Sequence, residues 1–314
     1  MPIVERDPWR FQFFEAVACP DHVRIPTDDP DCWLWYPEHR WVYDKLKVAE
    51  TQGLACGPHG TMPDRFPVFS KPMVNLRGMG IGSRRMDSPR AMAGHYAPGH
   101  MWMDYLTGPH VSTDCAVEKG EIRWSRHATG IPWTDGMFKY WTIHAHEQPD
   151  LETYLSEWVG RHMSTYTGMM NFETIGGRII EVHLRFADQW CDLYGQGWVE
   201  ALVGLYETGR WSFADGGRRD GFSIPLFAAH GATFRHPPVA LQASIRALPH
   251  VSSLQITFHE AREPSGHAMP PGGFRLGIIN CTDLDAGLAA RRQLASAFPA
   301  HLIQHQDLPE MSIT

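Results

Sequence analysis

Apolar and polar residues alternate between positions 168 and 188, where two apolar runs flank Gly176 and Gly177. A Gly-Gly pair tolerates positive φ angles, so this pattern predicts a β-hairpin. On the second strand the two-residue period separates two sets of side chains. One face receives Ile179, Glu181, His183 and Arg185, and the other receives Ile180, Val182 and Leu184. The hairpin therefore presents a carboxylate, an imidazole and a guanidinium on one surface.

The register of this hairpin decides whether Glu173 of the first strand joins that surface. Pairing Ile175 with Arg178 would turn Glu173 away. A three-residue loop beginning at Ile175 would instead pair Thr174 with Arg178 and bring Glu173 to the same face, diagonal to Glu181. We expect the second register, because glycine suits the left-handed position of a three-residue loop and two carboxylates suit Mg²⁺ held against phosphate oxygens. The alternative is a half-exposed hairpin with a surface ladder of charges.

The remaining periodicity predicts a mixed α+β chain. Apolar residues recur at helical spacing in 38–52, 150–163, 198–209, 239–247 and 284–298. Runs of β-branched and aromatic residues predict strands in 66–71, 111–118, 121–125, 137–143, 251–259 and 274–280. The first 37 residues lack sustained periodicity and are typical of a loop-rich segment, while glycines near 216–221 favour a boundary before a C-terminal lobe.

The composition excludes several classes of protein. The 314-residue chain has a formal net charge of −7, which argues against a surface for nucleic acid. Its six cysteines are widely spread without a Cys-X-X-Cys pair, so neither a zinc ribbon nor a disulfide framework is indicated. The charged N-terminus and the lack of an apolar run of about 18 residues predict a soluble, cytoplasmic protein with no membrane span. The oligomeric state is left open between monomer and homodimer.

One loop carries candidate phosphate-binding chemistry. The strand over 66–71 ends in Lys71, and the loop after it contains Gly78, Gly80 and Gly82. Such a loop can bring backbone N–H groups close to phosphate, although tight loops of any function are also rich in glycine.

Taken in sequence order, these pieces resemble the ATP-grasp superfamily, which includes biotin carboxylases, carbamoyl-phosphate synthetases and D-alanine ligases. Asp44-Lys45 and the turn at 52–58 are similar to the family's opening helix with its phosphate-binding lysine. Lys71 and the glycine loop are similar to its second lysine strand and flexible flap. The hairpin is similar to its metal-binding signature. The resemblance covers about residues 40–210 and rests on the order in which these motifs follow one another, not on any single motif.

The resemblance implies an ATP-grasp fold of α+β class, in which two lobes clasp a nucleotide. The implied divisions are an abbreviated N-terminal segment over 1–40, a small lobe over 41–106, a large lobe with the metal site over 107–212, and a C-terminal α/β lobe over 213–314.

The resemblance also implies the roles of individual residues. Those that would bind ATP are Lys45, Lys71, Gly78, Gly80, Gly82, Met103, Asp104, Leu106 and His110, with His110 at the ribose. Those that would hold Mg²⁺ are Glu173, Glu181 and His183. Those that would act in catalysis are Lys71 and Arg185. His183 stands where the family usually has Asn, and its nitrogen ligand makes Mn²⁺ a second candidate metal.

The activity implied is that of an ATP- and Mg²⁺-dependent ligase. It would activate a small-molecule carboxylate as an acyl phosphate for attack by an amine or related nucleophile. Two alternatives stay open. A metal-dependent hydrolase would use His144 and His146, because a His-X-His pair after a strand binds metal in some hydrolases. The second alternative is a nucleotide-binding protein that has lost catalysis. It is motivated by His183, which stands where the family usually has Asn.

Overall fold

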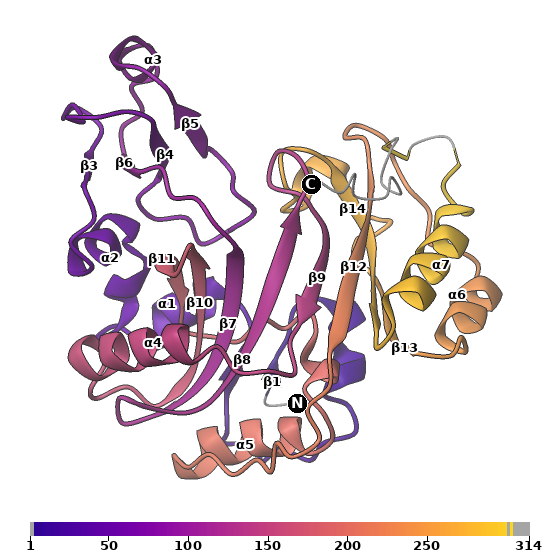
Figure 1. The fold of residues 1–314 in the computed structure, drawn as a ribbon. Coiled ribbons are helices and arrows are strands. Elements are labelled where there is room, and N and C mark those ends of the chain that lie inside the picture. Colours follow the sequence, from indigo (N-terminus) through magenta and orange to yellow (C-terminus); the bar gives the residue numbers. More distant parts are fainter. Residues whose placement is uncertain (1–2, 300–301, 304–314) are drawn as a thin grey trace.

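The computed structural model describes residues 3–299, 302 and 303, so the outer ends of the ranges 1–40 and 213–314 lie outside the described residues. Within them, the largest unit is an antiparallel sheet of eight strands (Figure 1). In spatial order these are β11 (Arg178–His183), β10 (Gly168–Ile175), β7 (His110–Glu118), β8 (Glu121–Pro132), β9 (Phe138–Ile143), β12 (Gly221–Ala228), β14 (Phe274–Cys281) and β13 (Val251–Ile256).

A second, four-stranded sheet lies apart from the first, at the upper left of Figure 1. Its strands in spatial order are β3 (Cys56–Pro58), β6 (His100–Asp104), β4 (Val68–Pro72) and β5 (Arg84–Met86). The helix α3 (Pro89–Ala93) lies at its far end, and α2 (Lys45–Thr51) lies between this sheet and the hairpin. The expected lysine strand is thus β4, and the glycine-rich loop joins it to β5.

Two amphipathic helices cover opposite faces of the large sheet. The helix α4 (Pro149–His162) buries Leu151, Leu155 and Trp158 against apolar side chains of β7, β10 and β11. The helix α5 (Trp198–Thr208) packs on the other face and ends at Gly209, whose φ of 73° suits glycine. The periodicity that predicted both helices is therefore confirmed.

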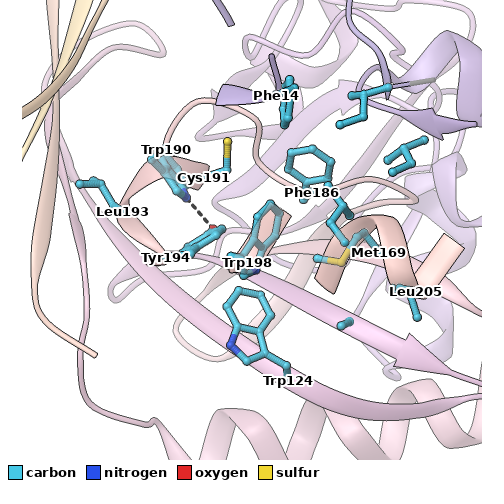
Figure 2. Close-up of a cluster of buried hydrophobic side chains, with 14 of the residues drawn as sticks. Phe14, Trp124, Met169, Phe186, Trp190, Cys191, Leu193, Tyr194, Trp198 and Leu205 are labelled. Carbon is cyan, nitrogen blue, oxygen red and sulfur yellow. Dashed lines mark hydrogen bonds between the residues drawn. The ribbon is translucent and has the colours of Figure 1, made fainter. Parts of the chain in front are cut away.

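The core beneath α5 is unusually aromatic. Figure 2 shows Trp124, Tyr194 and Trp198 gathered between the sheet and the helix, with ring centroids 4.9–5.9 Å apart. The indole of Trp190 donates a hydrogen bond of 2.8 Å to the Tyr194 hydroxyl. That hydroxyl donates in turn to Asp114 of β7 at 2.6 Å. The aromatic core is therefore bonded directly to a buried carboxylate of the large sheet.

The C-terminal elements extend the same sheet. The predicted helices and strands are present as α6 (Val239–Arg246), β13, β14 and α7 (Leu284–Ala295), with α6 and α7 on one side of the strands. The strand β12 was not predicted. It is buried almost throughout and contains Pro225, so its sequence shows neither alternation nor a continuous β-branched run. Because β12 pairs with β9, the sheet runs through the boundary proposed at 213.

The N-terminal segment consists of short elements, not loops alone. They are β1 (Ile3–Val4), the 3₁₀ helix η1 (Pro8–Phe13), β2 (Ile25–Pro26), α1 (Asp29–Trp35) and the 3₁₀ helix η2 (Arg40–Tyr43). Two further 3₁₀ helices, η3 (Cys191–Leu193) and η4 (Pro264–Gly266), lie later in the chain. The prediction of a single helix over 38–52 is wrong. It is divided at Asp44, whose carboxylate accepts hydrogen bonds from the backbone of Leu46 and Lys47 and so begins α2. None of the described helices is long and apolar enough to cross a membrane.

The expected hairpin register is also wrong. Ile175 pairs with Arg178 across a two-residue Gly176-Gly177 turn, yet Glu173 still lies directly opposite Glu181. A β-bulge at Ile180, which has no partner in the ladder, shifts the register by one residue.

The bulge also exchanges the expected faces of two isoleucines. Ile179 joins Val182 in the core under α4, whereas Ile180 packs toward the small sheet with Met103. Beyond the bulge, Glu181 and His183 keep the alternation that the sequence predicted. The bulge thus turns one apolar side chain to the same side as the polar ones.

The Gln52 side chain, directly after α2, satisfies the exposed edge of β11. The Gln52 amide accepts a hydrogen bond of 2.8 Å from the Ile179 N–H and donates one of 2.9 Å to the Ile179 carbonyl. The Tyr154 hydroxyl donates to the same Gln52 oxygen at 2.5 Å. An edge strand otherwise presents unpaired backbone groups, so Gln52 closes this edge next to the bulge.

We expect Gln52→Ala to lower the free energy of unfolding by roughly 1–3 kcal/mol, because it leaves backbone groups of Ile179 without partners. Urea unfolding measures the change. Gln293→Ala is the matched control, since Gln293 is exposed on α7. Equal stability of the two variants would contradict the role given to Gln52.

Candidate active site

Two lysines from different elements converge on the bulged strand. Lys45, the first residue of α2, places its Nζ 2.8 Å from Oε1 of Glu181. Lys71 of β4 donates from Nζ to the carbonyl oxygen of Ile180 at 2.7 Å. Both lysines are about 6% exposed. The small sheet, through Lys71, and α2, through Lys45, therefore both contact the hairpin by an ammonium group.

The environment of Lys71 changes its protonation. Burial lowers the pKa of Lys71 to about 8, with Glu181 opposing this change and Lys45 adding to it. A buried ammonium with one carbonyl acceptor is poorly compensated, so an anion that entered this space would raise the pKa again.

Two carboxylates face each other across the hairpin. Glu173 and Glu181 are direct cross-strand partners, which is closer than the diagonal placement expected from the sequence. His110 of β7 contacts Glu173, with 3.2 Å between Nε2 and Oε2. Burial alone would raise the pKa of Glu173, but the hydrogen bond with His110 and the charges of His183 and Arg185 lower it to about 2. Glu173 is therefore an anion at any physiological pH.

His183 is held by a residue that the sequence analysis did not select. Its Nδ1 lies 3.0 Å from Oδ2 of Asp29, the first residue of α1. Its Nε2 is buried without a hydrogen-bond partner among the described residues and lies 3.9 Å from Oε1 of Glu181. Bonding at Nδ1 directs the free nitrogen toward the carboxylate side of the hairpin.

The same Asp29 carboxylate holds Arg185 and Tyr43. Arg185 places Nε 3.0 Å from Oδ1 of Asp29, and the Tyr43 hydroxyl donates to Oδ1 at 3.1 Å. Burial alone would raise the pKa of Asp29, but the charges of Arg185 and His183 hold it well below its usual range. Arg185, expected to act in catalysis, is thus committed to a buried ion pair beside the site.

Asn171 lies on the same polar face, opposite His183 in the ladder. Its amide donates to Asp114 at 2.7 Å and to Ser112 at 2.9 Å. Burial raises the pKa of Asp114 to about 6 despite the hydrogen bonds from Tyr194 and Asn171. The two-residue period from Glu173 to Asn171 was the signal that would have selected Asn171.

The predicted adenine contacts are divided between two faces of the small sheet. Met103 and Leu106 lie in an apolar cluster with Ile180 of the hairpin. Asp104, one residue after Met103, points to the other side and pairs with Arg65 through two bonds of 2.9 and 3.1 Å. The structure therefore brings Met103 and Leu106 to the hairpin and leaves the Asp104 side chain outside this cluster.

The glycine-rich loop bends back toward the large sheet. Gly78, Gly80 and Gly82 have φ angles of 64°, 64° and 77°, which favour glycine. A Cβ placed on Gly136, between β8 and β9, would lie 3.2 Å from the Met79 carbonyl oxygen. The tip of the loop therefore approaches the large sheet.

A second group of buried charges extends from Arg185 toward the C-terminal strands. Arg10 of η1 pairs with Asp188, and burial together with the charge of Asp188 raises the pKa of Glu5 to about 8. Arg275 of β14 lies beside them. Burial and the charge of Arg10 lower the pKa of Arg275 to about 10, and its Nε has no hydrogen-bond partner among the described residues.

The carboxylates and His183 are suitable ligands for a divalent cation, and the orphaned Nε2 of His183 fits such a role. They do not form a preassembled cage. Among the described residues, the one group of three acidic, His or Cys side chains with ligand atoms all within 4.8 Å is His144, His146 and Asp220, at another place. Mg²⁺ is usually bound by one or two carboxylates and completed by substrate phosphates, so an open arrangement is compatible with it.

Comparison with known proteins agrees with this architecture. No protein-family model matches the sequence, and no curated protein matches it. Among solved structures, an L-amino acid ligase from Bacillus licheniformis has a TM-score of 0.63 at 13% identity, covering 92% of this chain and 82% of that one. A phosphoribosylamine–glycine ligase from Thermotoga maritima has a TM-score of 0.57 at 14% identity, covering 92% and 85%. A biotin carboxylase from Campylobacter jejuni, solved as a complex with β,γ-ATP, has a TM-score of 0.56 at 13% identity, covering 87% and 74%.

The chain therefore has the ATP-grasp fold, and the resemblance inferred from its motifs is confirmed at the level of the fold. The α+β class is confirmed as well. At these identities the likeness does not transfer an activity, and the roles of the individual residues stay predictions.

We expect Asp29→Asn to lower the free energy of unfolding by about 3 kcal/mol at pH 7, because it leaves the half-buried Arg185 without its counter-charge. The folded-state pKa of Asp29 is depressed, so its contribution is complete above about pH 4 and is lost as the pH falls further. Urea unfolding of both proteins from pH 7 to well below pH 4 measures this difference and its loss in acid.

The adjacent Asp28→Asn is the matched control. Asp28 caps α1 by accepting from the Asp31 N–H, which Asn does equally well, and its other partner is the exposed Arg6. If Asp29→Asn is no less stable than Asp28→Asn, the Asp29 carboxylate does not hold the site together.

Proposed function

We propose that this protein is an ATP- and Mg²⁺-dependent ligase that joins a carboxylate to an amine or related nucleophile. The observation that supports this proposal most strongly is the convergence of Lys45 and Lys71 on the strand that carries Glu181, opposite Glu173. Cations beside carboxylates at one junction suit a nucleotide triphosphate with its metal ion.

Each group has a role in this proposal. Lys45 and Lys71 neutralise the phosphates, and the glycine loop with Gly78, Gly80 and Gly82 folds over them and excludes water. The apolar cluster with Met103, Leu106 and Ile180 receives the adenine ring. His110 contacts the ribose in this proposal, from a position where it also lowers the pKa of Glu173.

Glu173, Glu181 and His183 would hold the divalent cation. Such a cation would supply positive charge that offsets the negative charge of the phosphates. Asp29 fixes the orientation of His183, so that Nε2 stays available on the carboxylate side. Because His183 supplies nitrogen where Mg²⁺ prefers oxygen, Mn²⁺ is the second metal to test.

The acid substrate is a small-molecule carboxylate, which attacks the γ-phosphorus of ATP to give an acyl phosphate and ADP. The amine acceptor then displaces inorganic phosphate. Arg275, whose Nε has no hydrogen-bond partner among the described residues, is the cation that would receive the anionic substrate. Structural neighbours named as an L-amino acid ligase and a phosphoribosylamine–glycine ligase agree with this class of reaction.

The direct experiment measures ADP release from ATP and Mg²⁺ across a panel of carboxylic acids, with and without a panel of amines. ADP release that requires both an acid and an amine is the expected result, with the coupled product identified by mass spectrometry. ATP binding without any transfer across the panel would instead indicate a nucleotide-binding protein that has lost catalysis.

Lys71 provides a test of the phosphate site that does not require turnover. With a pKa of about 8, Lys71 is mostly neutral at pH 8.5, and triphosphate binding should protonate it. We expect uptake of roughly 0.7 proton per ATP at pH 8.5 and almost none at pH 6.5. Calorimetry in buffers of different ionisation enthalpy measures the uptake.

Two variants complete this test. Lys71→Met should abolish that uptake and weaken ATP binding by roughly 10- to 100-fold. Lys47→Met, at an exposed position of α2, should behave like the unmodified protein. Equal proton uptake by Lys71→Met and the unmodified protein would place Lys71 outside the phosphate site.

Glu181→Gln tests the metal site. We expect Mg²⁺-dependent turnover to fall by roughly two orders of magnitude, because a charge that compensates the cation is lost. The buried Lys45 also loses its counter-charge, so stability without nucleotide should fall by about 1–3 kcal/mol. Initial rates against Mg²⁺ and Mn²⁺, with the exposed Glu157→Gln as control, measure the first effect. Turnover within twofold of Glu157→Gln would contradict the site.

A further inference from the structure

A compact group of potential metal ligands lies at the opposite end of β9 from the candidate active site. Phe138 begins β9 and its ring contacts His110, whereas His144 follows the end of the strand. Six residues of strand span roughly 20 Å. The group at His144 is therefore separate from the nucleotide site, and nothing in the proposed ligase reaction uses it.

The sheet register brings this group together. β9 and β12 pair only through Gly221–Ser223, with Ile143 opposite Gly221. His144 and Asp220, the next residues outward on the two strands, are consequently neighbours. The Ala145 N–H donates to Oδ1 of Asp220 at 2.6 Å, which fixes that carboxylate across the joint.

The ligand atoms are arranged for a shared ion. One potential ligand atom from each of His144, His146 and Asp220 lies within 4.8 Å of the others, and the two imidazole centroids are 4.6 Å apart. Nε2 of His144 is 2.7 Å from the Thr129 hydroxyl, which leaves Nδ1 for a metal. An oxygen partner on the second ring nitrogen is the usual way in which a metal-binding imidazole is oriented.

From this geometry we infer that His144, His146 and Asp220 bind one divalent transition-metal ion of the zinc type. Two imidazoles and one carboxylate are a common zinc ligand set, with water in the fourth position. The ion fastens the end of β9 to the start of β12, where the backbone pairing is only three residue pairs long. Its role is to secure the C-terminal strands to the rest of the large sheet.

This inference is tested by titrating zinc into the metal-free protein and measuring the heat of binding by calorimetry. Because zinc can also enter the nucleotide site, the titration is made in the Glu181→Gln background as well as in the unmodified protein. We expect one equivalent of zinc to bind in the Glu181→Gln background, and His146→Ala or Asp220→Asn in that background to weaken its binding at least tenfold. Asp220→Asn retains an oxygen for the Ala145 N–H, so the joint itself stays intact. His22→Ala, at an exposed histidine, is the control.

A second measurement reports on the joint. Zinc should slow amide hydrogen exchange in 142–145 and 221–223 in the unmodified protein and not in His146→Ala. The inference is overturned if zinc binds equally well to His146→Ala and the unmodified protein, or if exchange at the joint is insensitive to zinc. Either result is independent of whether the protein is a ligase, because neither assay contains ATP or substrate.

Discussion

The buried carboxylate of Asp29 is the contact on which the geometry of the candidate site depends. It receives His183 and Arg185 from the hairpin and Tyr43 from η2, while its own backbone begins α1. A guanidinium partly removed from water is costly unless a carboxylate compensates it, so Asp29 stabilises the packing of these elements against one another. The N-terminal segment, although short, therefore determines how the metal-binding face of the hairpin is presented.

The polar face also depends on the apolar core behind it. Asp114 accepts bonds from Tyr194 on the aromatic side and from Asn171 on the site side. Repacking the aromatic cluster would therefore move a carboxylate that positions Asn171, which lies opposite His183. Packing and site geometry are linked through one residue of β7.

Local patterns in the sequence predicted most elements and part of the site. The apolar stripe of α4 and the alternation of apolar and polar residues in β7 depend only on residues close in sequence. The bounds predicted for both elements nearly match the observed ones. The bulge at Ile180 was not predictable, because the partners that stabilise it, Gln52 and Lys71, come from distant segments. Asp29 was missed for the same reason, although the Asp28-Asp29-Pro30 sequence is typical of a helix start. The strand β12 escaped detection because a buried strand lacks alternation.

The continuity of the large sheet has a mechanical consequence. The strand β12 is bonded to β9 on one side and β14 on the other, so the C-terminal strands cannot swing away without breaking backbone ladders. The four-stranded sheet shares no ladder with the eight-stranded one within the described residues. Its contacts with the hairpin include the hydrogen bond from Lys71 to the Ile180 carbonyl, which breaks and reforms far more readily than a ladder. Among the described residues, the four-stranded sheet is therefore a unit that can shift against the large sheet without breaking a backbone ladder between the two.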